Sequence, residues 1–213
     1  MAQEIEVKTD ERAAGAGSTP PKITYEEFLR QADEDVSAEW VDGEVHYISP
    51  ASTKHQDLSD FLVAILRFFV EARDAGVVLS APFQMKTGPE LPGREPDLLF
   101  VAREHLNRLK QTRLEGPADL AVEIISPESR ARDRGAKFYE YEQGGVREYW
   151  MLDHLRKQAE FYQLNAEGIY QVVAPVDGVY HSCVLEGLAL RVEWLWQEPL
   201  PTLLSVLKEW KLV

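Results

Sequence analysis

The pattern of hydrophobic and polar positions divides the chain into an unpatterned start and a longer part in which helical and strand-like segments alternate. Residues 1–22 are polar, contain Gly, Ala and Ser, and end at Pro20-Pro21, with no periodic apolar face that packing would bury. We therefore expect a flexible tail over 1–22. The remaining residues, 23–213, are enough for one domain with a hydrophobic core, and we expect a single one.

Four segments have the pattern of helices. In "TYEEFLRQA", Thr24 and Glu27 have the spacing of a capping box and predict that a helix begins there. A second helix is expected from about 130 to 143, ending at Gly144-Gly145, and "PTLLSVLKEW" predicts a short helix near the C-terminus. A long amphipathic helix is expected from about 55 to 74, where apolar residues recur at helical spacing: Leu58, Phe61, Leu62, Ile65, Leu66 and Phe69.

Strand-like segments fill most of the rest. "EWVDGEVHYIS" contains two such runs joined by Asp42-Gly43, a dipeptide typical of tight hairpin turns. Further runs rich in branched and aromatic residues are "GVVLSAPFQMK", "PDLLFVA", "ADLAVEIIS", "REYWMLD", "KQAEFYQL", "GIYQVVAP" and "VYHSCVL". This mixture predicts an α/β or α+β fold with a mixed central sheet flanked by helices.

Composition limits the possible partners. The formal net charge is −13, so the chain lacks the broad basic surface of proteins that grip duplex DNA without sequence preference, and any contact with nucleic acid would need a local basic patch. Cys183 is the only cysteine, which rules out an intrachain disulfide and fits a reducing compartment. The N-terminus does not have the pattern of a signal peptide, and the apolar run "FLVAILRFFV" is short and interrupted by Arg67. We expect a cytoplasmic protein that makes no membrane contact.

Two carboxylates interrupt segments that otherwise look like core strands. Asp97 leads directly into "LLFVA", and Glu123 lies inside "DLAVEIIS", in which neither face is polar. Either residue alone has an ordinary explanation, such as an ion pair with a structural arginine or a hydrogen bond from a backbone N–H. Two carboxylates on adjacent core strands repel one another, and a hard divalent cation between them would remove that repulsion.

The residues from Pro96-Asp97 through "EIISP" to "KFYEYEQGGVREYWMLD" resemble the Uma-two family of putative restriction endonucleases, within the PD-(D/E)xK nuclease superfamily. The resemblance extends from about Tyr25 to Val213. It implies a mixed sheet flanked by helices, and cleavage of phosphodiester bonds assisted by Mg²⁺ or Mn²⁺. Carried over to this chain, it makes Asp97 and Glu123 catalytic metal ligands. Glu44, in the "VDGEV" hairpin, matches an early acidic position that the superfamily often adds to the metal shell.

The superfamily pattern has a lysine two residues after the second acid, and this chain has Ile125 there. An aliphatic side chain cannot activate water or balance charge in a transition state. In several members the lysine comes from the next helix, which makes Lys137 the candidate; Lys86 is a weaker substitute. On an α-helix Arg130, Asp133, Arg134, Lys137 and Tyr141 would share one face, which could direct Arg130 or Arg134 to a phosphate. The alternative is a solvated face with an internal Asp133–Lys137 pair.

Two further groups of residues have an open interpretation. Lys54 and His55 lie at the start of the long helix, where backbone N–H groups favour anions, and a histidine at this position matches the family. His55 is therefore a candidate substrate-binding residue, with a capping or surface role as the alternative. The aromatic residues of the 138–150 region could stack on bases, but their spacing is more typical of a core: Tyr139, Tyr141, Tyr149 and Trp150.

The sequence thus predicts a metal-dependent endonuclease that acts on nucleic acid, DNA rather than RNA, and that works as a homodimer with "WLWQEPLPTLL" as a possible interface or core segment. A non-catalytic module on a nuclease fold, binding protein or nucleic acid, is the alternative, because fold does not determine function. The missing lysine and the acidic charge favour the alternative, whereas the three acidic positions favour the nuclease.

Overall fold

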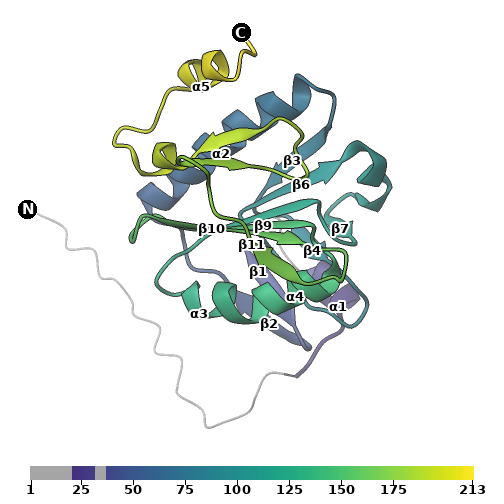
Figure 1. Cartoon of the computed structure of the whole chain (residues 1–213). Coiled ribbons are helices and arrows are strands. Elements are labelled where there is room, and N and C mark those ends of the chain that lie inside the picture. Colours follow the sequence, from purple (N-terminus) through teal and green to yellow (C-terminus); the bar gives the residue numbers. More distant parts are fainter. Residues whose placement is uncertain (1–20, 32–36) are drawn as a thin grey trace, which may run out of the picture.

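The computed structural model describes residues 21–31 and 37–213, so the predicted tail lies outside the described residues except for its last two (Figure 1). The predicted capping box is confirmed at the first helix, α1 (Tyr25–Gln31): the Thr24 N–H donates to Glu27 Oε2 at 2.8 Å, and the Glu27 N–H donates to Thr24 Oγ1 at 3.1 Å. The hairpin is also confirmed, with β1 (Ala38–Val41) and β2 (Glu44–Tyr47) joined by Asp42 and Gly43, both at positive φ.

A six-stranded mixed sheet forms the centre of the molecule, in the order β11-β10-β9-β8-β6-β3. Only the β8–β9 pair is parallel among its pairings. Its strands, in chain order, are β3 (Gly76–Ser80), β6 (Leu98–Ala102), β8 (Leu120–Ile124), β9 (Glu148–Asp153), β10 (Gln158–Leu164) and β11 (Tyr170–Val172). All residues of β6, β8 and β9 are buried, as expected for strands covered on both faces.

A second sheet of five strands has the order β2-β1-β5-β4-β7, where β4 is Gln84–Lys86, β5 is Gly93–Arg94 and β7 is Arg113–Glu115. The segment "GVVLSAPFQMK", predicted as one strand, contributes β3 to the central sheet and β4 to this second sheet. The division falls at Pro82, which has no N–H to donate to a continuous ladder.

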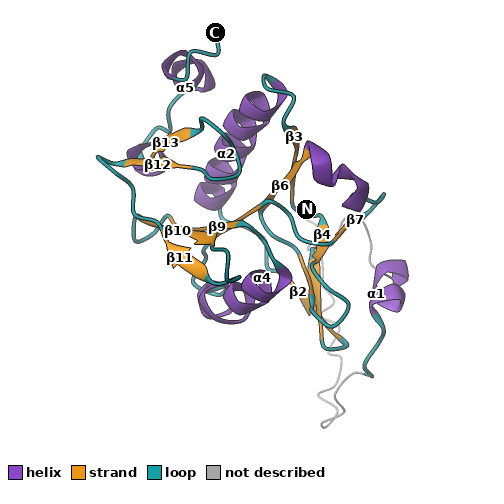
Figure 2. Cartoon of the chain, turned by 45° about the vertical axis from the view of Figure 1, so that its right-hand side comes forward, coloured by secondary structure: helices purple, strands orange, loops and turns teal. Residues whose placement is uncertain are grey.

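Helices cover both faces of the central sheet (Figure 2). The long amphipathic helix α2 (Thr53–Glu71) covers one face, and the helical region 130–144 covers the other. Beyond the sheet, a small hairpin and the C-terminal helices complete the fold. The remaining elements are η1 (Arg103–Arg108), α3 (Arg130–Arg132), η2 (Asp133–Lys137), α4 (Phe138–Gly144), β12 (Val179–His181), β13 (Ala189–Arg191), η3 (Val192–Trp196) and α5 (Leu203–Glu209).

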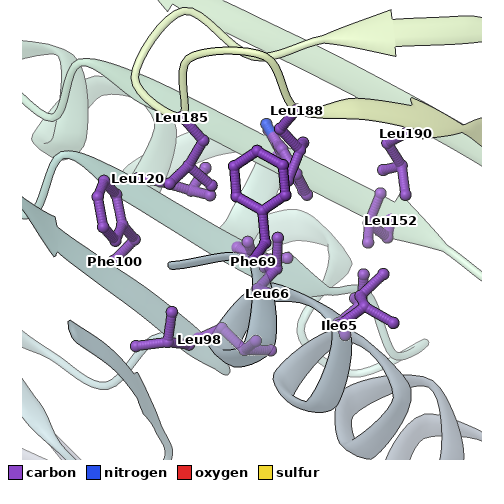
Figure 3. Close-up of a cluster of buried hydrophobic side chains, with 14 of the residues drawn as sticks. Ile65, Leu66, Phe69, Leu98, Phe100, Leu120, Leu152, Leu185, Leu188 and Leu190 are labelled. Atoms are coloured by element: carbon purple, nitrogen blue, oxygen red, sulfur yellow. The ribbon is translucent and has the colours of Figure 1, made fainter. Parts of the chain in front are cut away.

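The largest core cluster lies between α2, the central sheet and the segment that carries β12 and β13 (Figure 3). In that view Ile65, Leu66 and Phe69 of α2 face leucines of the sheet and of the C-terminal region. Trp194 and Leu195 of "WLWQEPLPTLL" belong to this core, whereas Leu203 and Leu204 are exposed. A second cluster lies on the opposite face of the sheet, beneath α4.

The core interpretation of the aromatic residues in the 138–150 region is confirmed for Tyr141, Tyr149 and Trp150, which are buried, whereas Tyr139 is 64 % exposed. The fold is thus the predicted mixed sheet flanked by helices. In the described part of the chain, no helix combines the length and the apolar character needed to cross a membrane.

Candidate active site

Asp97 and Glu123 come together because β6 and β8 are direct antiparallel neighbours. The register pairs Leu98 with Val122, so one residue further along it places Asp97 opposite Glu123. Residues opposite one another in an antiparallel pair point to the same face of the sheet. A hydrogen bond holds the arrangement, since the Ile124 N–H donates to Asp97 Oδ2 at 2.6 Å. The prediction that the two carboxylates lie on adjacent strands is therefore confirmed.

Lys137 reaches the same face from the helical region. Its Nζ lies 2.8 Å from Glu123 Oε1, and the Tyr141 hydroxyl donates to the same oxygen at 2.8 Å. The ammonium group also lies 2.8 Å from Glu39 Oε1 and 3.5 Å from Asp133 Oδ1, with only 2 % of the side chain exposed. The structure thus brings together Asp97, Glu123 and Lys137, whereas Ile125 is buried in the core.

The helical region does not follow α-helical spacing, because Asp133–Lys137 forms a π-helical segment between α3 and α4. Wider turns rotate the side chains away from the faces that α-helical spacing predicts, and π segments are frequent at functional sites. Asp133 and Lys137 point inward and are buried. The expected common face therefore does not form as a whole.

Arg130 and Arg134 make ion pairs with strand residues instead. Arg130 Nη2 lies 2.8 Å from Asp153 Oδ2, and Arg134 Nη1 lies 2.5 Å from Glu160 Oε1. Neither arginine is among the residues that line the cavity described below; Arg132 is. The phosphate-binding role predicted for Arg130 or Arg134 stays a prediction, and the structure does not bring either side chain to the acids.

Glu39, on β1, was not predicted as a site residue. Its side chain is fully buried, and it pairs with Lys137 and, at 2.9 Å, with Arg94 Nη1. Arg94 in turn makes two hydrogen bonds to Glu140, at 2.6 and 2.7 Å. The signal was present in "AEWV", where a carboxylate interrupts an otherwise apolar strand in the same way as Glu123 does.

Glu44 occupies a different position. It lies at the turn end of β2, its side chain is 43 % exposed, and within the described residues its one ion pair is with His46, at 3.9 Å. The metal-binding role predicted for Glu44 stays a prediction, and Glu39 is the residue of this hairpin that the fold places against Lys137. The substitute lysine, Lys86, donates to the Leu91 carbonyl oxygen and lies over the rings of Tyr25 and Trp40.

A cavity of about 760 Å³ opens over these groups. Asp97, Glu123 and Lys137 line it, together with Glu95 and the two histidines His55 and His154. His55 Nε2 lies 3.4 Å from Asp97 Oδ1, and its ring meets that of His154 edge to face, with 6.4 Å between the ring centroids. His55, predicted as a substrate-binding residue, is therefore in the cavity wall. Burial alone would lower the pKa of His55, but Asp97 outweighs burial and raises it.

At the base of the cavity, several carboxylates surround one ammonium group. Burial raises the pKa of Glu123 well above its ordinary value; Lys137 opposes this shift, and three neighbouring carboxylates add to it. Burial also raises the pKa of Glu95, whose Oε1 is buried with no hydrogen-bond partner among the described residues. Burial would lower the pKa of Lys137, but the carboxylates around it raise it, so this one ammonium group stays charged and is shared among several acids.

This arrangement fits a divalent cation that is bound mainly by two carboxylates. Mg²⁺ usually takes one or two protein carboxylates and completes its coordination with water and substrate phosphate oxygens. Asp97 is 21 % exposed toward the cavity, and both hydrogen bonds to Glu123 end on Oε1. Within residues 21–31 and 37–213, no three His, Cys, Asp or Glu side chains are arranged to hold a metal ion by themselves.

Comparison with known proteins identifies the family and the fold. The profile of the Uma2 family, described as "Putative restriction endonuclease", matches residues 25–193. Among solved structures, the chain is similar to a putative nuclease belonging to DUF820 from Anabaena variabilis, with a TM-score of 0.67 and 17 % sequence identity over 82 % of this chain and 97 % of that one. At that identity the likeness shows a shared fold. No curated protein matches the chain.

Proposed function

Because the chain belongs to the Uma2 family of putative restriction endonucleases, we propose that it is an endonuclease that hydrolyses phosphodiester bonds of nucleic acid with the help of Mg²⁺ or Mn²⁺. The observation that carries the proposal is the convergence of Asp97, Glu123 and Lys137 on one wall of one cavity. Two carboxylates for a cation and one ammonium group for a phosphate are what this reaction requires.

Asp97 and Glu123 are the residues that would hold the cation. When bound, a divalent cation supplies a water of lowered pKa and neutralises charge on the scissile phosphate. The raised pKa of Glu123 supports this assignment, because a buried carboxylate surrounded by other acids gains most from a nearby positive charge. Asp97 is kept in place by its hydrogen bond from the Ile124 N–H.

Lys137 would act as a charged hydrogen-bond donor. Its raised pKa means that it keeps its proton at neutral pH, so it stabilises negative charge on a phosphate oxygen or orients the attacking water, and it does not accept a proton. Glu39 acts through Lys137: its ion pair at 2.8 Å fixes the ammonium group from the side opposite to solvent. Glu39 is thus a positioning residue.

His55 would contact the substrate from the cavity wall. A ring N–H of His55 can donate a hydrogen bond to a phosphate oxygen at this position. The same ring also orients Asp97, since its Nε2 lies 3.4 Å from Asp97 Oδ1.

Three finer features belong to the proposal. We expect DNA rather than RNA as the substrate and a cytoplasmic location, as the sequence predicts. We also expect a homodimer. The exposed Leu203 and Leu204 of α5 support an apolar interface there, whereas Trp194 and Leu195 are buried within the chain itself. Sedimentation equilibrium of wild type and of Leu204→Asp tests the dimer.

The experiment for the function is titration of Mn²⁺ into wild type and the Asp97→Asn/Glu123→Gln double variant, followed by cleavage assays on single- and double-stranded DNA and RNA. We expect saturable binding and cleavage in wild type and neither in the double variant. Binding without cleavage of any polynucleotide would favour the non-catalytic module. Absence of binding in both proteins would overturn the metal site.

A further inference from the structure

Two features at the cavity have no role in the catalytic site proposed above. One is an aromatic side chain, Tyr47, at the end of β2, which lines the cavity although 75 % of it is exposed. The other is the β9–β10 turn, residues 154–157, which begins with the cavity residues His154 and Leu155 and continues into Arg156 and Lys157. We propose that together they bind an unpaired nucleic-acid strand, so that the substrate is single-stranded at the point of cleavage; this inference rests on the proposed nuclease function.

Tyr47 is exposed, as expected for a residue that contacts a ligand, and does not belong to the core. In the described part of the chain, the two large aromatic side chains that are mostly exposed are Tyr47 and Tyr139, and only Tyr47 lines the cavity. A base stacked on an exposed ring removes one face of the ring and one face of the base from water. Base–aromatic stacking is available only to a base that is not inside a duplex.

The β9–β10 turn presents positive charge in an otherwise acidic chain. Arg156 and Lys157 are exposed, and neither makes an ion pair with a described residue. The turn is held in place by Asp153, which accepts from the Arg156 N–H at 3.0 Å and from Arg130 at 2.8 Å. A turn fixed in this way offers its cations to a phosphate backbone without first having to be ordered.

Lys54, at the start of α2, extends this basic region. It lies 2.7 Å from Glu198, and both Lys54 and Lys157 are close enough to lower the pKa of Glu198. Lys54 is also close enough to His154 to contribute to the lowering of its pKa, after burial and His55. The result is a local basic patch made of Lys54, Arg156 and Lys157. Such a patch is what a chain of net charge −13 needs in order to approach a polyanion.

The depth of the catalytic groups favours a single strand over a closed duplex. Only 5 % of the Glu123 side chain and 2 % of the Lys137 side chain are exposed, so the scissile phosphate has to enter the cavity. A duplex is stiff over many base pairs, so bending it to bring a phosphate into the cavity costs free energy. An unpaired strand bends freely, and it can place a phosphate on Lys137 while a neighbouring base stacks on Tyr47.

The test measures binding of a fluorescein-labelled mixed-sequence DNA strand, its RNA counterpart and the DNA duplex by fluorescence anisotropy, with EDTA present so that nothing is cleaved. We expect wild type to bind the single strands more tightly than the duplex. Tyr47→Ala should weaken single-strand binding about 5-fold to 100-fold, while Tyr47→Phe keeps most of the affinity. Tyr139→Ala is the matched control, since it removes an exposed ring outside the cavity.

A second pair of variants tests the basic patch. Arg156→Glu should weaken binding and flatten its dependence on salt concentration, because fewer counterions are released. Lys208→Glu makes the same charge change on α5, which packs against the far end of α2 through Trp210 and Phe69, and it should leave binding close to wild type. The DNA and RNA strands show which polynucleotide is preferred.

Hydrolysis of bis(p-nitrophenyl) phosphate with Mn²⁺ separates this inference from the proposed function. Hydrolysis by wild type, together with weaker single-strand binding by Tyr47→Ala than by Tyr139→Ala, supports both. Hydrolysis combined with tighter duplex binding, or with equal effects of Tyr47→Ala and Tyr139→Ala, overturns the inference and leaves the nuclease. Absence of hydrolysis counts against the nuclease, and the anisotropy series then still decides whether Tyr47 binds a strand; no binding of any strand overturns the inference.

Discussion

Lys137 Nζ lies 2.8 Å from Glu39 Oε1, and this ion pair joins the first strand of the fold to the helical region that follows β8. Ninety-eight positions separate the two residues in the chain, yet each supplies the partner that allows the other to be buried as an ion. Because the same ammonium group lies 2.8 Å from Glu123, the stability of the fold and the geometry of the proposed active site depend on one contact network.

Glu39→Gln is expected to destabilise the fold in a pH-dependent manner. Burial raises the pKa of Glu39, but Lys137, Arg94 and Arg132 outweigh it and lower the pKa from 4.5 to about 2. A lowered pKa contributes stability that is present above pH 4.5 and is lost as the pH falls toward 2; a shift of this size corresponds to roughly 3 kcal/mol. Urea unfolding at neutral pH should show a lower free energy of unfolding for Glu39→Gln than for wild type. This difference between the two proteins should shrink near pH 3. Glu186→Gln removes an exposed carboxylate and should leave the free energy of unfolding unchanged both at neutral pH and near pH 3.

Glu123→Gln is expected to have the opposite pH dependence. The raised pKa of Glu123 means that the folded chain holds a proton that the unfolded chain has released, so wild type loses stability as the pH rises above 4.5. Glutamine has no proton to lose, and its amide oxygen still accepts from Lys137 and Tyr141. In EDTA, the melting temperature of the variant relative to wild type should rise with pH. If the difference in melting temperature between the variant and wild type stays constant as the pH rises above 4.5, the pKa of Glu123 is not raised in the folded chain.

Lys137→Met should remove cleavage and destabilise the fold by about 3–5 kcal/mol, the usual effect of leaving buried charges without their partner. Three carboxylates, those of Glu39, Glu123 and Asp133, lose their shared cation in this variant. Adding Glu123→Gln should recover part of the stability and none of the activity. A double-mutant cycle by urea unfolding measures the coupling, and recovery of activity in the double variant would contradict the role of Lys137.

Two substitutions of Asp97 distinguish the structural contribution of its carboxylate from the catalytic one. Asp97→Asn keeps an oxygen that can accept from the Ile124 N–H, so it should fold with nearly wild-type stability but lose Mn²⁺ binding and cleavage. Asp97→Ala leaves that N–H without its acceptor and should cost about 1–3 kcal/mol in addition. Thermal unfolding and Mn²⁺ titration of the two variants distinguish these effects; full activity of Asp97→Asn would exclude Asp97 as a metal ligand.

Features that depend on near neighbours in the chain could be predicted from the sequence. The capping box of Thr24 and Glu27, the Asp42-Gly43 turn and the long helix α2 each follow from residues only a few positions apart. The apolar surroundings of Glu123 predicted a strand covered on both faces, and the resemblance from Asp97 to Asp153 indicated the family that the comparison confirms.

Which charged groups meet depends on the three-dimensional packing and could not be predicted from the sequence. Glu39 reaches Lys137 because a hairpin from the start of the chain packs against the helical region, and no local pattern encodes that distance. Lys137 lies in the π-helical segment Asp133–Lys137 and is buried, whereas Arg130 and Arg134 pair with Asp153 and Glu160, so the common face that regular α-helical spacing predicts does not form. Local spacing determines elements, whereas the pairing of buried charges depends on long-range packing that places opposite charges within contact and excludes water from between them.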